Sequence, residues 1–393
     1  MSFDVERARA HTPGCAGRIH FNNCGAALMP TPVIDALKTH IDLEARIGGY
    51  EAAAAADEKV QATYSAVARM LNCRSSEVAI VENATRGWDM VFYAFDFEAG
   101  DRILTCSAEY ASNYIAYLQV ARKTGAVIET IPDDAHGAVD VDALREAVDE
   151  RVKLIAITHV PTNGGLVNPA AEIGKVAREH GIPFLLDACQ SAGQMPLDVE
   201  ELNVDILSAS SRKFLRGPRG MGFVYVREPL ITALEPPFLD LHAATWVAPG
   251  EYRLLDDARR FENWECNVAA KIALGTAVSY ALDWGLDAIE ARVAVISDAL
   301  RRGLASLPGV RLRDLGTRHC GIVSFTVGEI APDAVVQGLR ERGINTSVSR
   351  APSTQLDMHG RGLDALVRAG VHYYNSEEEV ARFLAALEEV IRQ

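Results

Sequence analysis

The chain has 393 residues, 49% of them hydrophobic, and a net charge of −14 at pH 7. This length predicts one large domain with a smaller companion, and the acidic balance argues against nucleic acid or an anionic membrane as the main partner. No apolar run reaches the roughly 20 residues of a membrane-spanning helix, and the N-terminus lacks the basic and apolar regions of a signal peptide. The seven cysteines are scattered without a Cys-x-x-Cys pair, so we expect no disulfide framework, no metal site and a cytoplasmic setting.

From about residue 60 to residue 225 the sequence alternates between helical and strand patterns. The strands are short, apolar and rich in β-branched residues, and the helices between them are amphipathic. This alternation predicts an α/β fold with a largely parallel sheet covered by helices on both faces, and ligands bind such sheets at the carboxyl ends of the strands. The expected elements are, in chain order, helix 60–71, strand 78–81, helix 85–95, strand 102–105, helix 113–124, strand 127–131, helix 141–148, strand 153–158, helix 171–180 and strands 184–187, 206–208 and 222–226.

Beyond about residue 265 the pattern changes, because strands become fewer and helices longer. A smaller α+β domain is expected there. We therefore predict an N-terminal segment 1–20 that packs on the small domain, a large domain 21–265 and a small C-terminal domain 266–393. The expected elements of the last part are helices 268–284 and 288–306, strand 321–327, helix 332–342, strand 371–374 and helix 377–392.

A lysine and an aspartate stand at the ends of two expected strands. Lys213 lies between strand 206–208 and the turn Gly217-Pro218, and Asp187 ends the apolar strand 184–187. A buried carboxylate needs a partner. The pair suits an enzyme that holds pyridoxal phosphate (PLP), with the lysine forming a Schiff base and the aspartate keeping the pyridine nitrogen protonated. The alternatives are a surface lysine and an aspartate that caps a helix.

A phosphate site is predicted where strand 78–81 meets the following helix. Thr85 and the free backbone N–H groups of the helix start, which includes Ala84 and Arg86, suit a phosphate group. Ser210 and Arg212 would approach from the other side, and a guanidinium fork is well matched to phosphate. An ordinary N-cap threonine is the alternative interpretation of Thr85.

The walls of the expected ring site come from two strand ends. Tyr110 follows strand 102–105 and can stack on a pyridine ring, although a core tyrosine is the commoner use of such a position. Ala188 or Cys189, beside Asp187, would cover the opposite face. Gln190 would reach the ring hydroxyl oxygen.

Arg368 is the candidate for binding a substrate carboxylate. It stands between apolar residues in Val367-Arg-Ala-Gly-Val, where an arginine needs a polar partner. A structural ion pair is the alternative. The order and the strand-end placement of all these residues make the combination more specific than any single motif.

This order of motifs resembles the class V aminotransferase family, which includes cysteine desulfurases and has the fold-type-I PLP architecture. Asp187-Ala-Cys-Gln190 is similar to its Asp-x-x-Gln motif, and Ser210-Ser-Arg-Lys213 with the following Gly-Pro-Arg-Gly-Met-Gly is similar to its Ser-x-His-Lys and glycine-rich motif. Arg368 with Tyr374-Asn375 resembles the motif whose arginine binds the substrate carboxylate. The resemblance runs from about residue 21 to the C-terminus and implies a seven-stranded type of sheet with a smaller α+β C-terminal domain.

Within this family, several sequence segments are most similar to a branch described as isopenicillin-N-epimerase-like or hercynylcysteine-sulfoxide-lyase-like. They include Phe21-Asn-Asn-Cys-Gly, Gly48-Gly-Tyr50-Glu-Ala and His159-Val-Pro-Thr-Asn-Gly-Gly165. From this resemblance we take Thr162 as a cofactor contact and Asn23, Tyr50 and Asn163 as substrate contacts. A plain helix–helix turn is the alternative role of the segment that carries Tyr50.

The sequence departs from the desulfurase pattern in several places. Segment 347–354 fills the place of the loop that carries the persulfide-forming cysteine and contains no cysteine. Tyr110 stands where desulfurases have a ring-stacking histidine, Arg212 replaces the histidine before the lysine, and Trp264-Glu265 falls where a Gly-Thr from the partner subunit contacts the phosphate. A persulfide relay of the desulfurase kind is therefore not expected.

The expected reaction begins when an amino acid displaces Lys213 from PLP in an external aldimine and the freed amine removes the Cα proton. We favour β-elimination from a cysteine-derived substrate by a C–S lyase; an aminotransferase and an epimerase or racemase remain alternatives. A non-catalytic binding protein on the same fold is a remote alternative, as is an α/β enzyme that does not use PLP, for which no GxGxxG or P-loop pattern is present. The family resemblance implies a homodimer with a shared active site.

Overall fold

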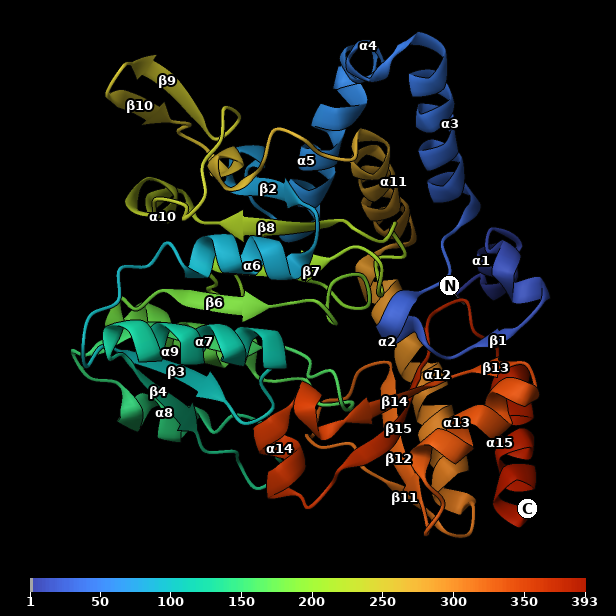
Figure 1. Ribbon diagram of the computed structural model, residues 1–393. Coiled ribbons are helices and arrows are strands. Elements are labelled where there is room, and N and C mark those ends of the chain that lie inside the picture. The colour runs from blue at the N-terminus through green and yellow to red at the C-terminus, as the bar shows by residue number, and fades with distance from the viewer. Residues whose placement is uncertain (1–2) are drawn as a thin grey trace.

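The computed structural model describes residues 3–393, and a seven-stranded sheet forms the centre of its larger part (Figure 1). The strand order is β2-β8-β7-β6-β5-β3-β4; β8 is antiparallel to both of its neighbours and the remaining pairs are parallel. The strands are β2 (Val78–Val81), β3 (Arg102–Cys106), β4 (Val127–Ile131), β5 (Val152–Thr158), β6 (Phe184–Asp187), β7 (Ile206–Ser210) and β8 (Gly222–Val226).

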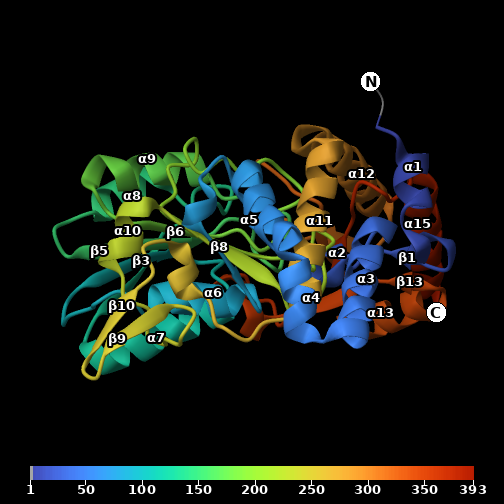
Figure 2. The same cartoon turned by 90° about the horizontal axis from the view of Figure 1, so that it is seen from above.

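Helices cover both faces of this sheet, which is why its central strands are apolar on both sides (Figure 2). The core on one face is built with α5 (Asp57–Leu71), α8 (Val141–Ala147), α9 (Ala170–His180) and α11 (Val268–Trp284). The core on the other face is built with α6 (Ala84–Phe92), α7 (Ala111–Thr124), α10 (Glu228–Ala233) and η3 (Ala258–Phe261). The structure thus confirms the expected α/β sheet flanked by helices.

The smaller part contains a four-stranded antiparallel sheet in the order β11-β12-β15-β14, as expected for an α+β domain. Its core lies between this sheet and the helices α12, α13 and α15. The elements are α12 (Leu286–Ser306), β11 (Val310–Leu312), β12 (Ile322–Val327), α13 (Pro332–Glu341), β13 (Ile344–Asn345), β14 (Ser347–Arg350), η4 (Ala351–Ser353), α14 (Gln355–Gly360), β15 (Ala365–Gly370) and α15 (Glu377–Arg392).

Residues 3–77 join both parts. Strand β1 pairs in parallel with β13, and α3 packs against α11. Because α11 also places Ala270, Leu274 and Val278 in the core of the large sheet, the division of the chain at residue 265 stays a prediction. The segment contains α1 (Val5–Ala10), η1 (Pro13–Ala16), β1 (Ile19–His20), α2 (Asn23–Ala26), α3 (Thr31–Ile47), α4 (Gly49–Ala55) and η2 (Ser75–Glu77).

The expected strand 371–374 is wrong. The strand of this region is β15, which ends at Gly370, and the chain then turns away from the sheet. Tyr373 and Tyr374 are buried because they pack around the guanidinium of Arg216, not because they belong to a ladder. The sequence analysis also missed the hairpin of β9 (Ala244–Ala248) and β10 (Glu251–Leu254), which projects from the large part (Figure 1).

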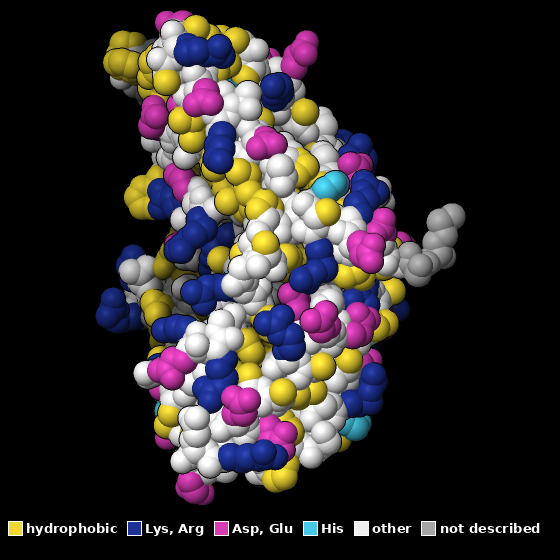
Figure 3. Space-filling view, turned by 90° about the vertical axis from the view of Figure 1, so that its right-hand side faces the viewer, with side chains coloured by type: hydrophobic (Ala, Val, Ile, Leu, Met, Phe, Trp, Pro, Cys, Tyr) yellow, Lys and Arg dark blue, Asp and Glu magenta, His cyan; other side chains and the backbone are white. Residues whose placement is uncertain are grey.

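The carboxyl ends of the parallel strands point towards the right-hand side of Figure 1, the side that Figure 3 shows from the front. Lys and Arg side chains gather around a hollow on this face. No helix among residues 3–393 is long and apolar enough to cross a membrane.

Gly193 links two loops at this edge of the sheet. It has a φ of +91°, and a Cβ there would lie 2.5 Å from the carbonyl of Phe214. We expect Gly193→Ala to lower the free energy of unfolding by at least about 3 kcal/mol, because backbone strain and a backbone clash add. Gly181→Ala is the matched control: φ is +65° but nothing lies within 4 Å, so about 1 kcal/mol is expected. Urea denaturation measures both, and equal losses would contradict the prediction.

Candidate active site

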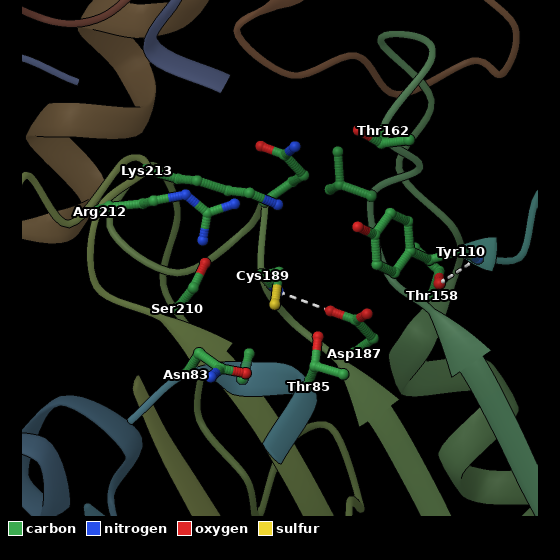
Figure 4. Close-up of a pocket in the computed structure, with 13 residues that line it drawn as sticks. Asn83, Thr85, Tyr110, Thr158, Thr162, Asp187, Cys189, Ser210, Arg212 and Lys213 are labelled. Carbon is green, nitrogen blue, oxygen red and sulfur yellow. Dashed lines mark hydrogen bonds between the residues drawn. The ribbon is translucent and has the colours of Figure 1, made fainter. Parts of the chain in front are cut away.

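Lys213 is held in a tight loop between β7 and β8. The backbone N–H of Gly217 donates to the carbonyl of Ser211 (2.8 Å), and that of Arg216 donates to the carbonyl of Lys213 itself (3.0 Å). These bonds fix the start of the lysine side chain, which ends in a pocket at the carboxyl edge of the sheet (Figure 4). Burial lowers the pKa of the Lys213 amine, against the opposing effect of Cys189 and Asp187.

Asp187 faces the same pocket from the end of β6 and is 6% exposed. Its Oδ1 accepts from the backbone N–H of Cys189 (2.9 Å), and its Oδ2 accepts from the Asn113 amide (3.0 Å). Both donors are neutral, so these bonds hold the carboxylate in place without neutralising it. The carboxylate is therefore suited to a positively charged group in the pocket.

One end of the pocket is lined by Asn83, Ala84 and Thr85 at the start of α6, with Ser210 and Arg212 beside them. The buried Ser210 hydroxyl has no hydrogen-bond partner in the part of the chain that the structure describes, and the Arg212 guanidinium points towards it (Figure 4). A Cβ on the neighbouring Gly222 would lie 2.8 Å from the backbone nitrogen of Ala84, so the glycine leaves the helix start open. Free donors at a helix start with an arginine and a hydroxyl suit a phosphate group.

The remaining walls come from β3, β5 and the turn after Asp187. Tyr110 and Cys189 stand on either side of the Asp187 carboxylate (Figure 4). Gln190 donates to the carbonyl of Cys24 (3.1 Å), while its buried Oε1 has no partner. Thr158, Val160 and Thr162 complete the lining.

These residues fit PLP. Lys213 supplies an amine, Asp187 a carboxylate without a cationic hydrogen-bond donor, and the start of α6 a phosphate cradle. Two polar atoms in the pocket wall, Ser210 Oγ and Gln190 Oε1, have no hydrogen-bond partner among residues 3–393. Buried polar atoms are seldom left unpaired in the working state of a protein, so a polar ligand is expected to satisfy them.

Arg368 reaches the pocket edge from the small sheet. Its guanidinium donates to the carbonyl and hydroxyl of Thr162, the latter at 2.6 Å, and its Nε donates to the Ser347 hydroxyl (3.2 Å). All of these acceptors are neutral. A half-buried arginine without a carboxylate partner next to a pocket is suited to binding a carboxylate from the substrate.

Besides Arg368, four predicted residues do not line the pocket. The Arg86 backbone N–H is used by the Asn83 side chain, and its guanidinium lies 4.7 Å from the ring centre of Phe238. The Asn163 side chain is hydrogen-bonded to Asp357. The Asn23 side chain is hydrogen-bonded to Gly370 and Tyr374. Both asparagines therefore hold together segments of the chain next to the site. Tyr50 lies on α4 with 73% of its surface exposed.

The sequence analysis missed the residues behind the pocket wall. Asn113 holds Asp187, and Glu109 accepts hydrogen bonds from both Asn113 and Thr158. The available signal was two polar residues spaced four apart where a buried strand meets a helix. That spacing places both on one side of the helix start.

Segment 347–354 folds as β14 and the short η4, and β14 pairs antiparallel with β15 with Ser347 opposite Arg368. The pocket itself contains one cysteine, Cys189. Burial raises the pKa of its thiol to about 12, and the charge of Asp187 adds to this effect. The reactive form of a cysteine is the thiolate, so this thiol is poorly suited to carrying sulfur.

A family model described as Aminotransferase class-V matches residues 19–383. The chain belongs to this family. It is 30% identical to a probable cysteine desulfurase of Pyrococcus abyssi, over 98% of both chains. A cysteine desulfurase structure from Thermococcus onnurineus superimposes with a TM-score of 0.93 at 29% identity, over 100% of this chain and 99% of that one.

The fold is also similar to that of the C–S lyase C-DES, at 26% identity. A structure of C-DES with glycine covalently linked to its PLP cofactor has a TM-score of 0.87 and covers 97% of this chain and 99% of that one. Another holds the reaction product cysteine persulfide, with a TM-score of 0.86 and coverage of 96% and 99%. The family expected from the sequence motifs is therefore confirmed.

Cys189 should resist alkylation in the native protein. With a pKa of about 12, roughly one thiol in ten thousand is ionised at pH 8. Iodoacetamide at pH 8 followed by peptide mass mapping should leave Cys189 unmodified in the apo protein, whereas the denatured protein reacts at all seven cysteines. Rapid selective labelling of Cys189 would show that the pocket does hold a reactive thiolate.

Proposed function

We propose that the protein is a PLP-dependent enzyme that cleaves the C–S bond of a cysteine-derived amino acid. The observation that carries this proposal is the Lys213 amine in one pocket with the Asp187 carboxylate, beside polar atoms that lack partners in the protein. The similarity to C-DES, whose structures contain PLP and a cysteine persulfide product, supports the choice of reaction.

PLP would be bound by Lys213 and Asp187 at its ring and by Ser210, Arg212 and the α6 start with Thr85 at its phosphate. Tyr110 and Cys189 would cover the two ring faces, and Gln190 and Thr162 would complete the site. When bound, PLP supplies an electron sink for the pair that remains when Cα loses its proton.

The role of Lys213 is to hold and move a proton at Nζ. Because burial lowers its pKa, the free amine is more often neutral than an exposed lysine would be, and a neutral amine can accept the Cα proton. The C–S bond then breaks with its electron pair on sulfur, which leaves as a thiol or persulfide. Addition of water to the remaining three-carbon unit gives pyruvate and ammonia.

Arg368 would bind the substrate carboxylate by exchanging part of its contact with Thr162. Asn163 and Asn23 would act by holding the backbone on either side of the site, through Asp357 and Gly370. With no cysteine in segment 347–354 and a raised pKa at Cys189, the sulfur product would be released directly and not passed to a protein thiol.

We also propose a cytoplasmic homodimer. Support for the dimer comes from exposed apolar side chains on one stretch of the large part, Leu241, Trp246 and Trp264, which are 69%, 78% and 50% exposed. Tyr50, which does not line its own pocket, would then contact the substrate bound by the partner. All seven cysteines are free, which fits a reducing compartment.

The function is tested by absorbance and by product analysis. Purified protein supplied with PLP should show a band above the protein envelope that shifts when L-cysteine, L-cystine or a cysteine S-oxide is added, with pyruvate formed. Lys213→Ala should lose the lysine-bound band and at least a thousandfold of the rate, because no other lysine among residues 3–393 lines the pocket. Lys175→Ala, an exposed lysine on α9, should change neither.

Other outcomes would redirect the proposal. A spectral shift without pyruvate would indicate an aminotransferase or an epimerase. The absence of any band after PLP is supplied would overturn the cofactor assignment.

The dimer is tested by sedimentation velocity. Wild-type protein should sediment as a species of about 85 kDa, twice the 42.6 kDa chain. Trp246→Asp should shift it towards monomer, because a charge in an apolar interface is costly. Val295→Asp, which alters a 53% exposed apolar residue on α12, should leave the dimer intact. A wild-type monomer would contradict the proposal.

A further inference from the structure

Glu109 is a buried carboxyl group behind the pocket wall. It follows β3, is 3% exposed and does not line the pocket itself. Its Oε1 accepts from the Asn113 amide (2.9 Å), from the backbone N–H of Tyr110 (2.8 Å) and from the Thr158 hydroxyl. A carboxyl group with this number of bonds is held in one orientation.

The bond to Asn113 connects Glu109 to the pocket. The same Nδ2 atom lies 2.9 Å from Glu109 Oε1 and 3.0 Å from Asp187 Oδ2, so one amide group bridges two carboxyl groups. Through this bridge Glu109 supports the orientation of Asp187. Through its bond to the Tyr110 backbone it also supports the residue that stands on the other side of Asp187.

No positive charge accompanies this pair at hydrogen-bond distance within residues 3–393. The other groups that face Glu109 are Thr105 (3.0 Å) and Cys106 from β3 and Tyr117 from α7, and they are neutral donors. Burial raises the pKa of Glu109 to about 7, and repulsion from Asp187 adds to that effect. A cation placed in the pocket next to Asp187 would relieve the repulsion.

We propose that Glu109 is a positioning residue for the cofactor, which fixes Asp187 through Asn113 and Tyr110 through its backbone and adds a second negative charge behind the one that faces the pyridine nitrogen. The inference rests on the proposed function, because it assigns Asp187 to a protonated ring. Without the ring Glu109 holds a proton below a pH of about 7. Binding of the cationic ring lowers the pKa of Glu109, so between the bound-site and empty-site pKa values the proton passes to solvent and the carboxylate remains.

The contribution of Glu109 to PLP affinity should change with pH in a defined direction. Because binding favours the carboxylate of Glu109, the pKa of Glu109 is lower in the bound site than in the empty site. The contribution of Glu109 to PLP affinity is therefore absent below the bound-site pKa, grows between the two pKa values and is complete above the empty-site pKa. The experiment compares the dissociation constants of PLP for apo wild-type protein and apo Glu109→Gln between pH 5.5 and pH 8.5, by absorbance titration. The titrations of PLP and Lys213 are common to both proteins, so the ratio of the two constants isolates Glu109.

We expect the variant and the wild type to bind equally at the acid end and the variant to bind roughly tenfold more weakly at pH 8, the size of one charge acting through a buried site. Glu77→Gln is the matched control, since Glu77 is 7% exposed but accepts from the backbone of Arg74 and Glu228 away from the pocket. The ratio of the PLP dissociation constant of Glu77→Gln to that of the wild type should stay near one at every pH.

A ratio for Glu109→Gln that does not change with pH would overturn the inference, because a purely structural loss weakens binding equally throughout. If that variant does not fold, Asn113→Ala cuts the bridge instead and should weaken both PLP binding and the circular dichroism of the bound cofactor at pH 8; wild-type behaviour would overturn the inference. A wild-type protein that develops no PLP band overturns the proposed function as well, whereas a wild-type band with a constant ratio overturns this inference alone.

Discussion

The loop that presents Lys213 is the constraint on which the rest of the site depends. An amine at the carboxyl edge of a sheet is useful only if it is held next to Asp187 and away from bulk water. Hydrogen bonds from Gly217 to Ser211 and from Arg216 to Lys213 set the loop, and the glycine at 193 lets the segment after Gln190 approach it closely. The position of the lysine is thus decided by backbone contacts that contain no charge.

Arg216 extends that constraint to the rest of the molecule. It adopts a left-handed conformation (φ 60°), and its guanidinium donates to Thr12, to the carbonyl of Leu28 and to the Tyr373 hydroxyl (2.7 Å). The N-terminal part of the chain, the lysine loop and the segment that follows β15 therefore meet at the buried guanidinium of Arg216. Since Arg368 belongs to that small sheet, the edge of the pocket where Arg368 lies is connected to the lysine loop through the same contact.

The sequence predicted the residues that stand at strand ends and failed where a role depends on packing between distant elements. Lys213 and Asp187 could be found because an apolar strand that ends in a polar residue places it at the sheet edge. Asn113 and Glu109 give no such signal, because their role exists only once β3, α7 and β6 are assembled. The strand expected at 371–374 was wrong, because the aromatic residues there pack against the guanidinium of Arg216. Tyr50 does not line the pocket of its own chain, so its predicted role stays a prediction.

Segment 347–354 bears on how sulfur would leave the site. In the desulfurase pattern this place belongs to a loop that carries a cysteine. Here β14 forms a ladder with β15, and Ser347 is bonded to Arg368, the residue expected to hold the substrate. The first half of this segment, residues 347–350, cannot swing into the pocket without breaking those bonds. The same pairing that orients Arg368 therefore supports the proposal that the sulfur product is released into solvent and not transferred to the protein.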